Sequence, residues 1–198
     1  WVELGYGEVR ARVQRIATWL LRQDLSPDRP VLVLSGNGLE HALLMHACLH
    51  VGVPVCSLSA GNSLQSKDFG KLNDAVVLAG SSTAAAPGTT PFAEVARTEP
   101  ETHSVQSAFR RVGPDSIAKF LFTSGSIGAP KAVITTQRMM CSNAEMKSVI
   151  WRFLNATRPV IVDWLPWSHV FGGSHNMNIV LRFGGSLYLD DGKPLPAL

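Results

Sequence analysis

The chain has 198 residues, of which 45% are hydrophobic and 17% are charged, and its formal net charge is +3. This composition can build a sizeable core and suits one large domain, and the weak charge argues against a nucleic-acid-binding protein. The three cysteines lack the spacing of metal ligands or of a disulfide framework, so we expect a cytoplasmic protein. No apolar run reaches the roughly 20 residues that a membrane-spanning helix needs, so we expect no membrane span.

The first part of the chain alternates between helical and strand-like patterns. Apolar residues recur at helical spacing, and short apolar runs bounded by turn residues are typical of buried strands. The predicted segments are a helix over Tyr6–Leu21, a strand over Val31–Leu34, a helix from about Asn37 to Val51 and a strand around Pro54. Asn37 with Glu40 resembles a capping box, and Gly52 is placed to end that helix. A strand, a helix and a strand in this order predict two parallel strands of an α/β fold.

Three histidines lie on the second predicted helix. His46 and His50 are one helical turn apart, a spacing that can hold a metal ion. No acidic third ligand accompanies them on that face, and apolar residues lie beside them. We therefore expect His41, His46 and His50 to be packed or surface histidines and assign no metal site.

The middle of the chain carries weaker patterns. Ala75–Ala79 predicts a short strand, and Ser81–Pro91 is rich in the small and turn-forming residues of a loop. Phe92–Arg97 predicts one helical turn, and we expect Thr98–Ser107 to be irregular.

A small and hydroxylated segment then interrupts two apolar, strand-like runs. Phe120–Phe122 is followed by Thr123-Ser124-Gly125-Ser126-Ile127-Gly128-Ala129-Pro130-Lys131, and Ala132–Ile134 resumes the apolar pattern. Glycines let a backbone approach a polyanion, hydroxyl and amide groups donate to phosphate oxygens, and a lysine supplies positive charge. The spacing differs from the Walker pattern, in which Gly-Lys-Ser/Thr opens a helix. The segment predicts a phosphate-binding loop between two paired strands, with a plain Ser/Gly hairpin turn as the alternative.

The last third predicts a helix, a strand, a helix and a strand. Thr135 or Thr136 is placed to cap a helix that runs to about Leu154, and its methionine-rich apolar face favours packing in the core. Strands are predicted over Val160–Leu165 and Ser186–Leu189. Between them, His169 follows the carboxyl end of a strand, where open α/β sheets bind ligands. A histidine that caps the next helix is the alternative, and the loop at 123–131 favours the ligand-binding interpretation.

Two stretches, in this order and spacing, resemble core motifs of the adenylate-forming superfamily. They are LFTSGSIGAPKAVITTQRMMCSN and VDWLPWSHVFGGSHNMNIVL, and the flanks ARVQRIATWLL, VGPDSIAKFLFTSGS and LYLDDGKP are most similar to feruloyl-CoA synthetases. The resemblance implies an α/β fold, with residues 1–198 forming part of the large N-terminal domain, which has mixed sheets flanked by helices. It also implies a reaction in which a carboxylate and ATP give an acyl-adenylate and pyrophosphate, and CoA then displaces AMP, with Mg²⁺ as the cofactor.

The resemblance also assigns roles to individual residues. The loop over the β- and γ-phosphates would consist of Thr123, Ser124, Gly125, Ser126, Gly128 and Lys131. Lys131 would counter charge on the phosphates, and His169 would orient the acyl carboxylate and line the path of the thiol. The acyl pocket would be walled in part by Phe171, Gly172 and Gly173. No residue is assigned to a metal.

Two residues of the loop depart from the family pattern. Ile127 stands where threonine is usual, and Ala132 stands where glycine is usual. Asn73-Asp74 runs almost directly into the apolar run that begins at Ala75, where the family pattern implies a further helix and strand. The Tyr-Gly-x-Thr-Glu stretch and the small C-terminal domain lie outside these residues. We expect a fragment of a longer enzyme that is inactive alone. The alternatives are an acyl-CoA ligase for another carboxylate, a truncated remnant that binds only phosphate, and a phosphate-loop kinase, which Pro130 and the following strand disfavour.

Overall fold

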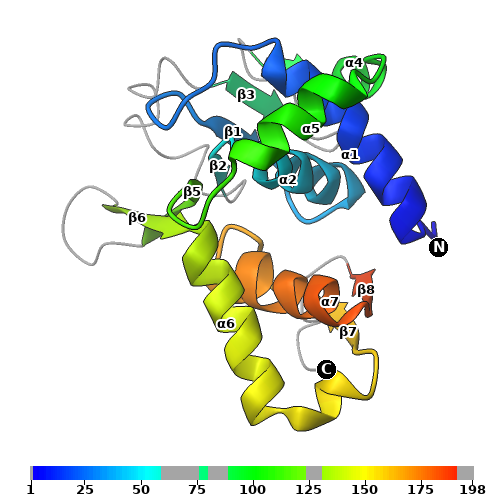
Figure 1. Cartoon of the computed structure of the whole chain (residues 1–198). Helices are drawn as coiled ribbons and strands as arrows, with labels where there is room; N and C mark the ends of the chain where they lie inside the picture. Colours follow the sequence, from blue (N-terminus) through cyan, green and yellow to red (C-terminus); the bar gives the residue numbers. More distant parts are fainter. Residues whose placement is uncertain (1, 59–75, 80–88, 124–130, 191–198) are drawn as a thin grey trace, which may run out of the picture.

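The computed structural model describes residues 2–58, 76–79, 89–123 and 131–190 (Figure 1). The larger part of the molecule is a six-stranded sheet with helices packed against it. Its strands are β1 (Val31–Leu34), β2 (Val55–Leu58), β3 (Val76–Ala79), β4 (Thr89–Pro91), β5 (Ile117–Thr123) and β6 (Lys131–Thr136). Their order across the sheet is β4-β3-β1-β2-β5-β6, and every neighbouring pair is parallel except β5 and β6.

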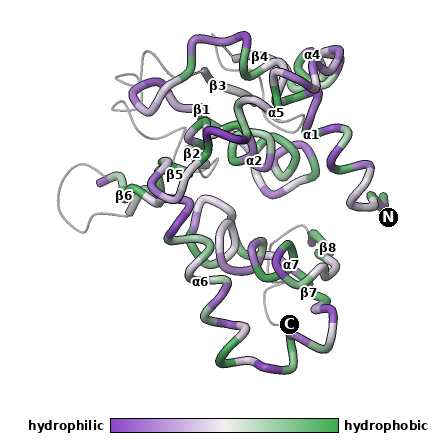
Figure 2. Tube along the Cα trace, viewed as in Figure 1, coloured by the Kyte–Doolittle hydropathy of each residue, from purple (hydrophilic) through white to green (hydrophobic). Residues whose placement is uncertain are grey.

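The central strands β1 and β2 are apolar because side chains pack on both faces of the sheet at that place. Val31 and Val33 of β1 face the main core, which they share with helices α1 (Tyr6–Leu21), α2 (Leu39–Val51) and α5 (Thr102–Arg111). Leu32 points to the other face, where it packs with Cys56 and Phe120. The hydrophobic colour along α2 in Figure 2 fits its place between the sheet and the outer helices. The short helix α4 (Phe92–Ala96) adds its buried Val95 to the same core.

A second, smaller part follows β6 along the chain and lies beside the main sheet (Figure 1). It contains α6 (Gln137–Ile150), a 3₁₀ turn η2 (Arg152–Asn155), β7 (Val160–Asp163), a π-helical turn η3 (Phe171–Asn176), α7 (Met177–Phe183) and β8 (Ser186–Leu189). Strands β7 and β8 form a parallel two-stranded sheet. The two parts share one core, because Trp167 and Met177 pack among the side chains of α1 and α2.

Several predicted elements are confirmed, and four expectations are wrong. Ser81–Pro91 was expected to be a loop, but its last three residues form strand β4, which pairs with β3. The stretch expected to be irregular after Thr98 contains helix α5, which buries only Val105 and Ala108 and therefore has a weak apolar pattern. Helix α2 begins at Leu39 without a side-chain cap, and Asn37 contacts a distant turn instead. The methionine-rich face of α6 is not core, because only Met140 of its methionines is buried.

Candidate functional site

The two ends of the predicted phosphate loop lie side by side. Strands β5 and β6 pair in antiparallel register, and Thr123, the last residue of β5, lies opposite Lys131, the first residue of β6. Lys131 is exposed at this end of the sheet. The predicted strands on both sides of the loop are therefore confirmed. Ser124, Gly125, Ser126 and Gly128, with Ile127, lie outside the described residues.

His169 lies in the turn that follows the carboxyl end of β7. Its backbone N–H donates to Pro166 O at 3.0 Å, and its carbonyl accepts from Gly173 N at 3.0 Å. The imidazole Nδ1 accepts a hydrogen bond from the Phe171 N–H at 3.2 Å. Because an acceptor nitrogen carries no proton, this bond places the ring N–H at Nε2. His169 is exposed, so Nε2 is available to a ligand.

A buried carboxylate shapes this turn from within. Asp163, the last residue of β7, is 0% exposed. It accepts hydrogen bonds from Trp167 Nε1 at 2.8 Å, Asn176 Nδ2 at 2.9 Å and Leu165 N at 3.3 Å. Burying a carboxylate is costly unless such donors replace water. The three bonds join the end of β7 to the turn and to η3, and they fix the backbone that carries His169.

Asn37 ties the same turn to the main sheet. Its Nδ2 donates to Leu165 O at 2.7 Å, and its Oδ1 accepts from Trp167 N at 3.0 Å. Asn37 lies two residues before the start of helix α2 at Leu39. The sequence pattern assigned its side chain to helix capping, but it instead bridges two parts of the chain that are 128 residues apart. Trp167 is buried behind this bridge, where its ring lies edge-on to His41 at 5.2 Å between centroids.

The three histidines of α2 have different environments. Buried His41 contacts Gly36 O through Nδ1 at 3.1 Å and Ser57 Oγ through Nε2 at 2.8 Å, and burial lowers its pKa to about 4. Burial likewise lowers the pKa of His46 to about 4, with the Lys119 charge adding to the effect. His50 stacks on Phe109 at 4.7 Å between ring centroids. Within the described parts of the chain, no group of three or more His, Cys, Asp or Glu side chains is placed to hold a metal ion.

The glycines after His169 are positions of close backbone packing. A Cβ atom on Gly172 would lie 2.5 Å from Leu165 O, and one on Gly173 would lie 2.2 Å from Trp167 O. Both distances are far below van der Waals contact, so a side chain at either position would push η3 away from the turn. Phe171 is half-exposed and stacks on His175 at 4.4 Å between ring centroids.

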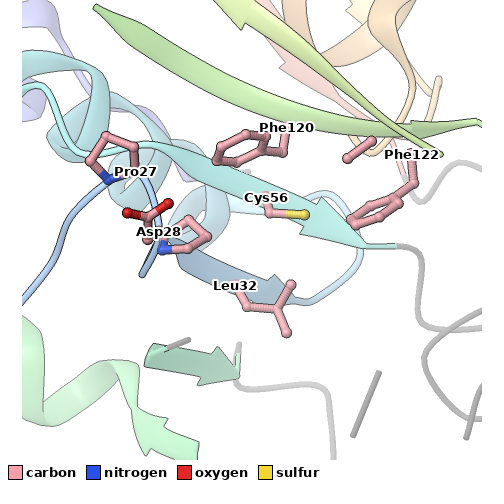
Figure 3. Close-up of a pocket in the computed structure, with 8 residues that line it drawn as sticks. Pro27, Asp28, Leu32, Cys56, Phe120 and Phe122 are labelled. Atoms are coloured by element: carbon pink, nitrogen blue, oxygen red, sulfur yellow. The ribbon is translucent and has the colours of Figure 1, made fainter. Parts of the chain in front are cut away.

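One apolar cavity of about 200 Å³ lies on the face of the sheet opposite α2 (Figure 3). Its wall includes Leu32 of β1, Cys56 of β2 and Phe120 and Phe122 of β5, with Pro27 and Asp28 at one side. Pro30 and Ala132 also line it. Burial raises the pKa of the Cys56 thiol to about 12, so this thiol stays protonated and unreactive at neutral pH. The cavity shares only the strands that flank the loop with the predicted site, and none of the predicted site residues lines it.

The polar groups that hold the His169 turn in place escaped the sequence analysis. Asp163 and Lys119 are charged residues within otherwise apolar strand patterns. This interruption was the one feature of the sequence that could have marked them as buried polar contacts. Asn37 had a local explanation as a cap, so its long-range role was missed. No helix in the described part of the chain is long and apolar enough to cross a membrane.

Comparison with known proteins places this arrangement in a family. A model of the AMP-binding enzyme family matches residues 1–197. The fatty acid–[acyl-carrier-protein] ligase MmaC of Mycobacterium marinum is 30% identical over 224 aligned positions, which cover 98% of this chain and 40% of MmaC. The medium-chain-fatty-acid–[acyl-carrier-protein] ligase JamA of Moorena producens is 20% identical, with 85% of this chain and 31% of JamA covered.

Solved structures have the same fold. The ATP-bound structure of MatB from Rhodopseudomonas palustris matches with a TM-score of 0.77 at 21% identity, covering 98% of this chain and 41% of MatB. The chain spans less than half the length of each of these relatives. The mixed α/β sheets with flanking helices are those of the N-terminal adenylation domain, so the predicted fold class is confirmed. Since the family match covers almost every residue, the chain belongs to the AMP-binding, adenylate-forming enzymes.

Proposed function

We propose that residues 1–198 form part of the large N-terminal domain of an ATP-dependent acid ligase. The observation that carries the proposal is that Thr123 and Lys131 lie opposite each other at the ends of β5 and β6. This pairing brings together the two ends of a Ser/Gly-rich loop, as a loop that encloses a polyphosphate requires. The family match over residues 1–197 supports the same conclusion.

In the proposed reaction, a carboxylate oxygen attacks the α-phosphorus of ATP, and the bond to the β-phosphate oxygen breaks to release pyrophosphate. The loop residues Thr123, Ser124, Gly125, Ser126 and Gly128 would donate N–H and O–H groups to the β- and γ-phosphates. Lys131 would stabilise the charge that the departing pyrophosphate acquires. Mg²⁺ would supply further charge neutralisation when bound. The described residues contain no acidic cluster that fits this ion, so we assign no residue to it.

His169 is the proposed contact to the acyl carboxylate. The Phe171 N–H occupies its Nδ1 at 3.2 Å, which leaves an N–H at Nε2 to donate to a carboxylate oxygen. Phe171 is half-exposed beside His169 and offers an aromatic surface to the acyl group. Gly172 and Gly173 would contribute backbone to this wall, since neither has room for a side chain.

The acyl group and its thiol acceptor are the finer parts of the proposal. The resemblance to feruloyl-CoA synthetases favours hydroxycinnamates or other aromatic acids, with CoA as the acceptor. MmaC and JamA are named as ligases that join fatty acids to an acyl carrier protein, which makes a fatty acid and a carrier-protein thiol the second candidates. A remnant that at most binds phosphate is the alternative without catalysis.

The test is ATP–pyrophosphate exchange by the protein expressed from its complete reading frame, with cinnamic and fatty acids as substrates. We expect exchange that depends on the acid and falls about 10²–10³-fold in Lys131→Ala and in His169→Ala, the usual cost of losing one preorganised group. Arg110→Ala is the matched control, because Arg110 is an exposed cation on α5. Absence of exchange with every acid would favour the remnant. Product analysis with CoA and with a carrier protein identifies the acceptor.

Ile127 offers a separate test of the phosphate loop. A hydrogen bond to a charged phosphate contributes about 1.5–3 kcal/mol, and isoleucine cannot make the bond that threonine would make. We expect Ile127→Thr to tighten ATP binding about ten- to a hundredfold, since about 1.4 kcal/mol corresponds to one decade. Calorimetry with equal affinities for the two forms would contradict a phosphate contact at this position.

A further inference from the structure

One buried ammonium group connects strand β5 to the turn η3 that follows His169. Lys119 lies in the middle of β5 and is only 2% exposed. Its Nζ donates to Gly173 O of η3, 54 residues away, and contacts Met45 Sδ of α2 at 3.1 Å. No carboxylate of the described residues pairs with it, and burial lowers its pKa to about 8.

Packing alone does not account for a lysine at this position. The neighbouring Ala118 and Leu121 are buried and apolar, and a methionine would fill a similar volume without the cost of desolvating a charge. The feature that an apolar residue lacks is a donor directed at the Gly173 carbonyl. A buried charged group that makes a specific bond between two elements fixes their relative position at some cost in stability.

The two residues joined by the Lys119–Gly173 hydrogen bond are each close in sequence to one of the candidate motifs. Lys119 is four residues before Thr123, where the phosphate loop begins, and Gly173 is four residues after His169. Gly173 also donates its N–H to the His169 carbonyl at 3.0 Å. A single residue, Gly173, thus accepts from the strand that enters the loop and donates to the residue proposed to hold the carboxylate.

We propose that Lys119 is a positioning residue that sets the place of the His169 turn relative to the strand entering the phosphate loop. This inference rests on the proposed function for its catalytic consequence. Asn37 fastens the start of the segment 165–173 through Leu165 and Trp167, and Lys119 fastens its end through Gly173. The two attachments together hold His169 between fixed points.

The test compares Lys119→Met with Lys147→Met in the protein expressed from its complete reading frame. Lys147 is a matched control because it is also largely buried, and its Nζ contacts Asn143 of its own helix α6. In ¹⁵N-histidine spectra, with the His169 signal assigned by His169→Gln, we expect wild type and Lys147→Met to show one Nε2–H tautomer. We expect Lys119→Met to show averaged tautomers and amide exchange at Gly173 about ten- to a hundredfold faster, the factor for one charge-assisted hydrogen bond.

The kinetic arm separates this inference from the proposed function. In Lys119→Met we expect KM for the acid to rise about tenfold and KM for ATP to change less than about twofold, because β5 keeps its place in the sheet. An inactive wild type would contradict the proposed function. The histidine spectra and the amide exchange at Gly173 would still test the positioning role of Lys119, because neither measurement requires activity. An active Lys119→Met protein with the wild-type His169 spectrum would overturn the positioning role. If Lys119→Met does not fold, the ¹⁵Nζ spectrum of wild-type Lys119 decides: slowly exchanging ammonium protons support the bond to Gly173, and rapidly exchanging ones refute it.

Discussion

Two histidines whose pKa values are lowered by burial make the stability of this protein depend on pH. Burial lowers the pKa of His41 from 6.5 to about 4, so the unfolded chain binds a proton at a higher pH than the folded one does. The folded state therefore loses stability as the pH falls from about 6.5 to about 4, by up to about 3 kcal/mol for this one group. His46 acts in the same direction.

We predict that His41→Gln reduces this pH dependence. Glutamine removes the titrating group and retains the ability to bond to Gly36 O or Ser57 Oγ, the present partners of His41. Urea unfolding at pH 7 and pH 5 should show a clearly smaller loss of stability in the variant than in wild type. Exposed His103 provides the control, and His103→Gln should leave the pH dependence unchanged. An equal loss in His41→Gln and wild type would mean that His41 does not resist protonation.

The close approach of backbone at Gly173 gives a second prediction at the scale of one residue. A methyl group there would lie 2.2 Å from Trp167 O, and backbone cannot move aside as a flexible side chain would. We expect Gly173→Ala to lower the free energy of unfolding by about 3 kcal/mol or more. Gly113→Ala should change it by less than about 0.5 kcal/mol, because a Cβ at Gly113 meets nothing within 4 Å. Similar urea midpoints for both variants would contradict the packing seen at η3.

At the scale of elements, hydrophobic periodicity and turn residues correctly predicted several helices and strands. Helix α1 and strands β1 and β8 have the predicted ends, and Gly52 and Gly184 end their helices with φ of 75° and 65°. Helix α5 was missed because two buried residues suffice to dock it. The exposed methionines of α6 were assigned to the core because a sequence pattern records apolar character and not what covers it.

Thr136 tests the predicted start of α6. Its hydroxyl accepts the Met139 N–H at 3.3 Å and satisfies one of the free donors of the first turn. We expect Thr136→Ala to cost about 1 kcal/mol of stability. Thr136→Ser retains the oxygen and should recover most of that loss. Equal destabilisation by alanine and serine in thermal unfolding would point to the lost methyl group rather than to the cap.

At the scale of the whole molecule, the positions of the site residues were more predictable than the contacts that hold them. The loop ends and the His169 turn follow from short patterns next to strands. The bonds from Asn37 and Lys119 to the His169 turn connect residues 54 to 130 positions apart, and no local periodicity encodes such contacts. These contacts depend on how β5, α2 and η3 pack together, which the sequence pattern alone does not specify.

The two-stranded sheet of β7 and β8 exposes apolar side chains that can promote self-association of the protein. Val160 and Val162 of β7 are 69% and 63% exposed, and Tyr188 of β8, which lies opposite Val162, is on the same face. Exposed apolar strands favour association. We expect Val160→Thr/Val162→Thr to reduce self-association in light scattering without loss of stability, because threonine keeps the β-branched shape. Ile161→Thr, on the opposite face, should instead destabilise the fold. Unchanged scattering in the double variant would show that this face does not drive association.

The last prediction is that the 198 residues alone do not complete the ligase reaction. They span less than half of the length of MmaC, JamA and MatB. The proposed loop would hold the β- and γ-phosphates, and we assign no residue of this chain to the α-phosphate, where charge also builds. Each missing preorganised group commonly costs about 10²–10³ in rate, and here several would be missing together.

The measurement is pyrophosphate release with ATP, Mg²⁺, CoA and the panel of acids. It is made for the 198-residue chain and, as the control, for the protein of the complete reading frame. We expect pyrophosphate binding by the 198-residue chain to survive where turnover does not, because Thr123 and Lys131 still bring the loop ends together. Turnover of about 1–10³ per second, the ordinary range for enzymes, would mean that the catalytic groups lie within these residues after all.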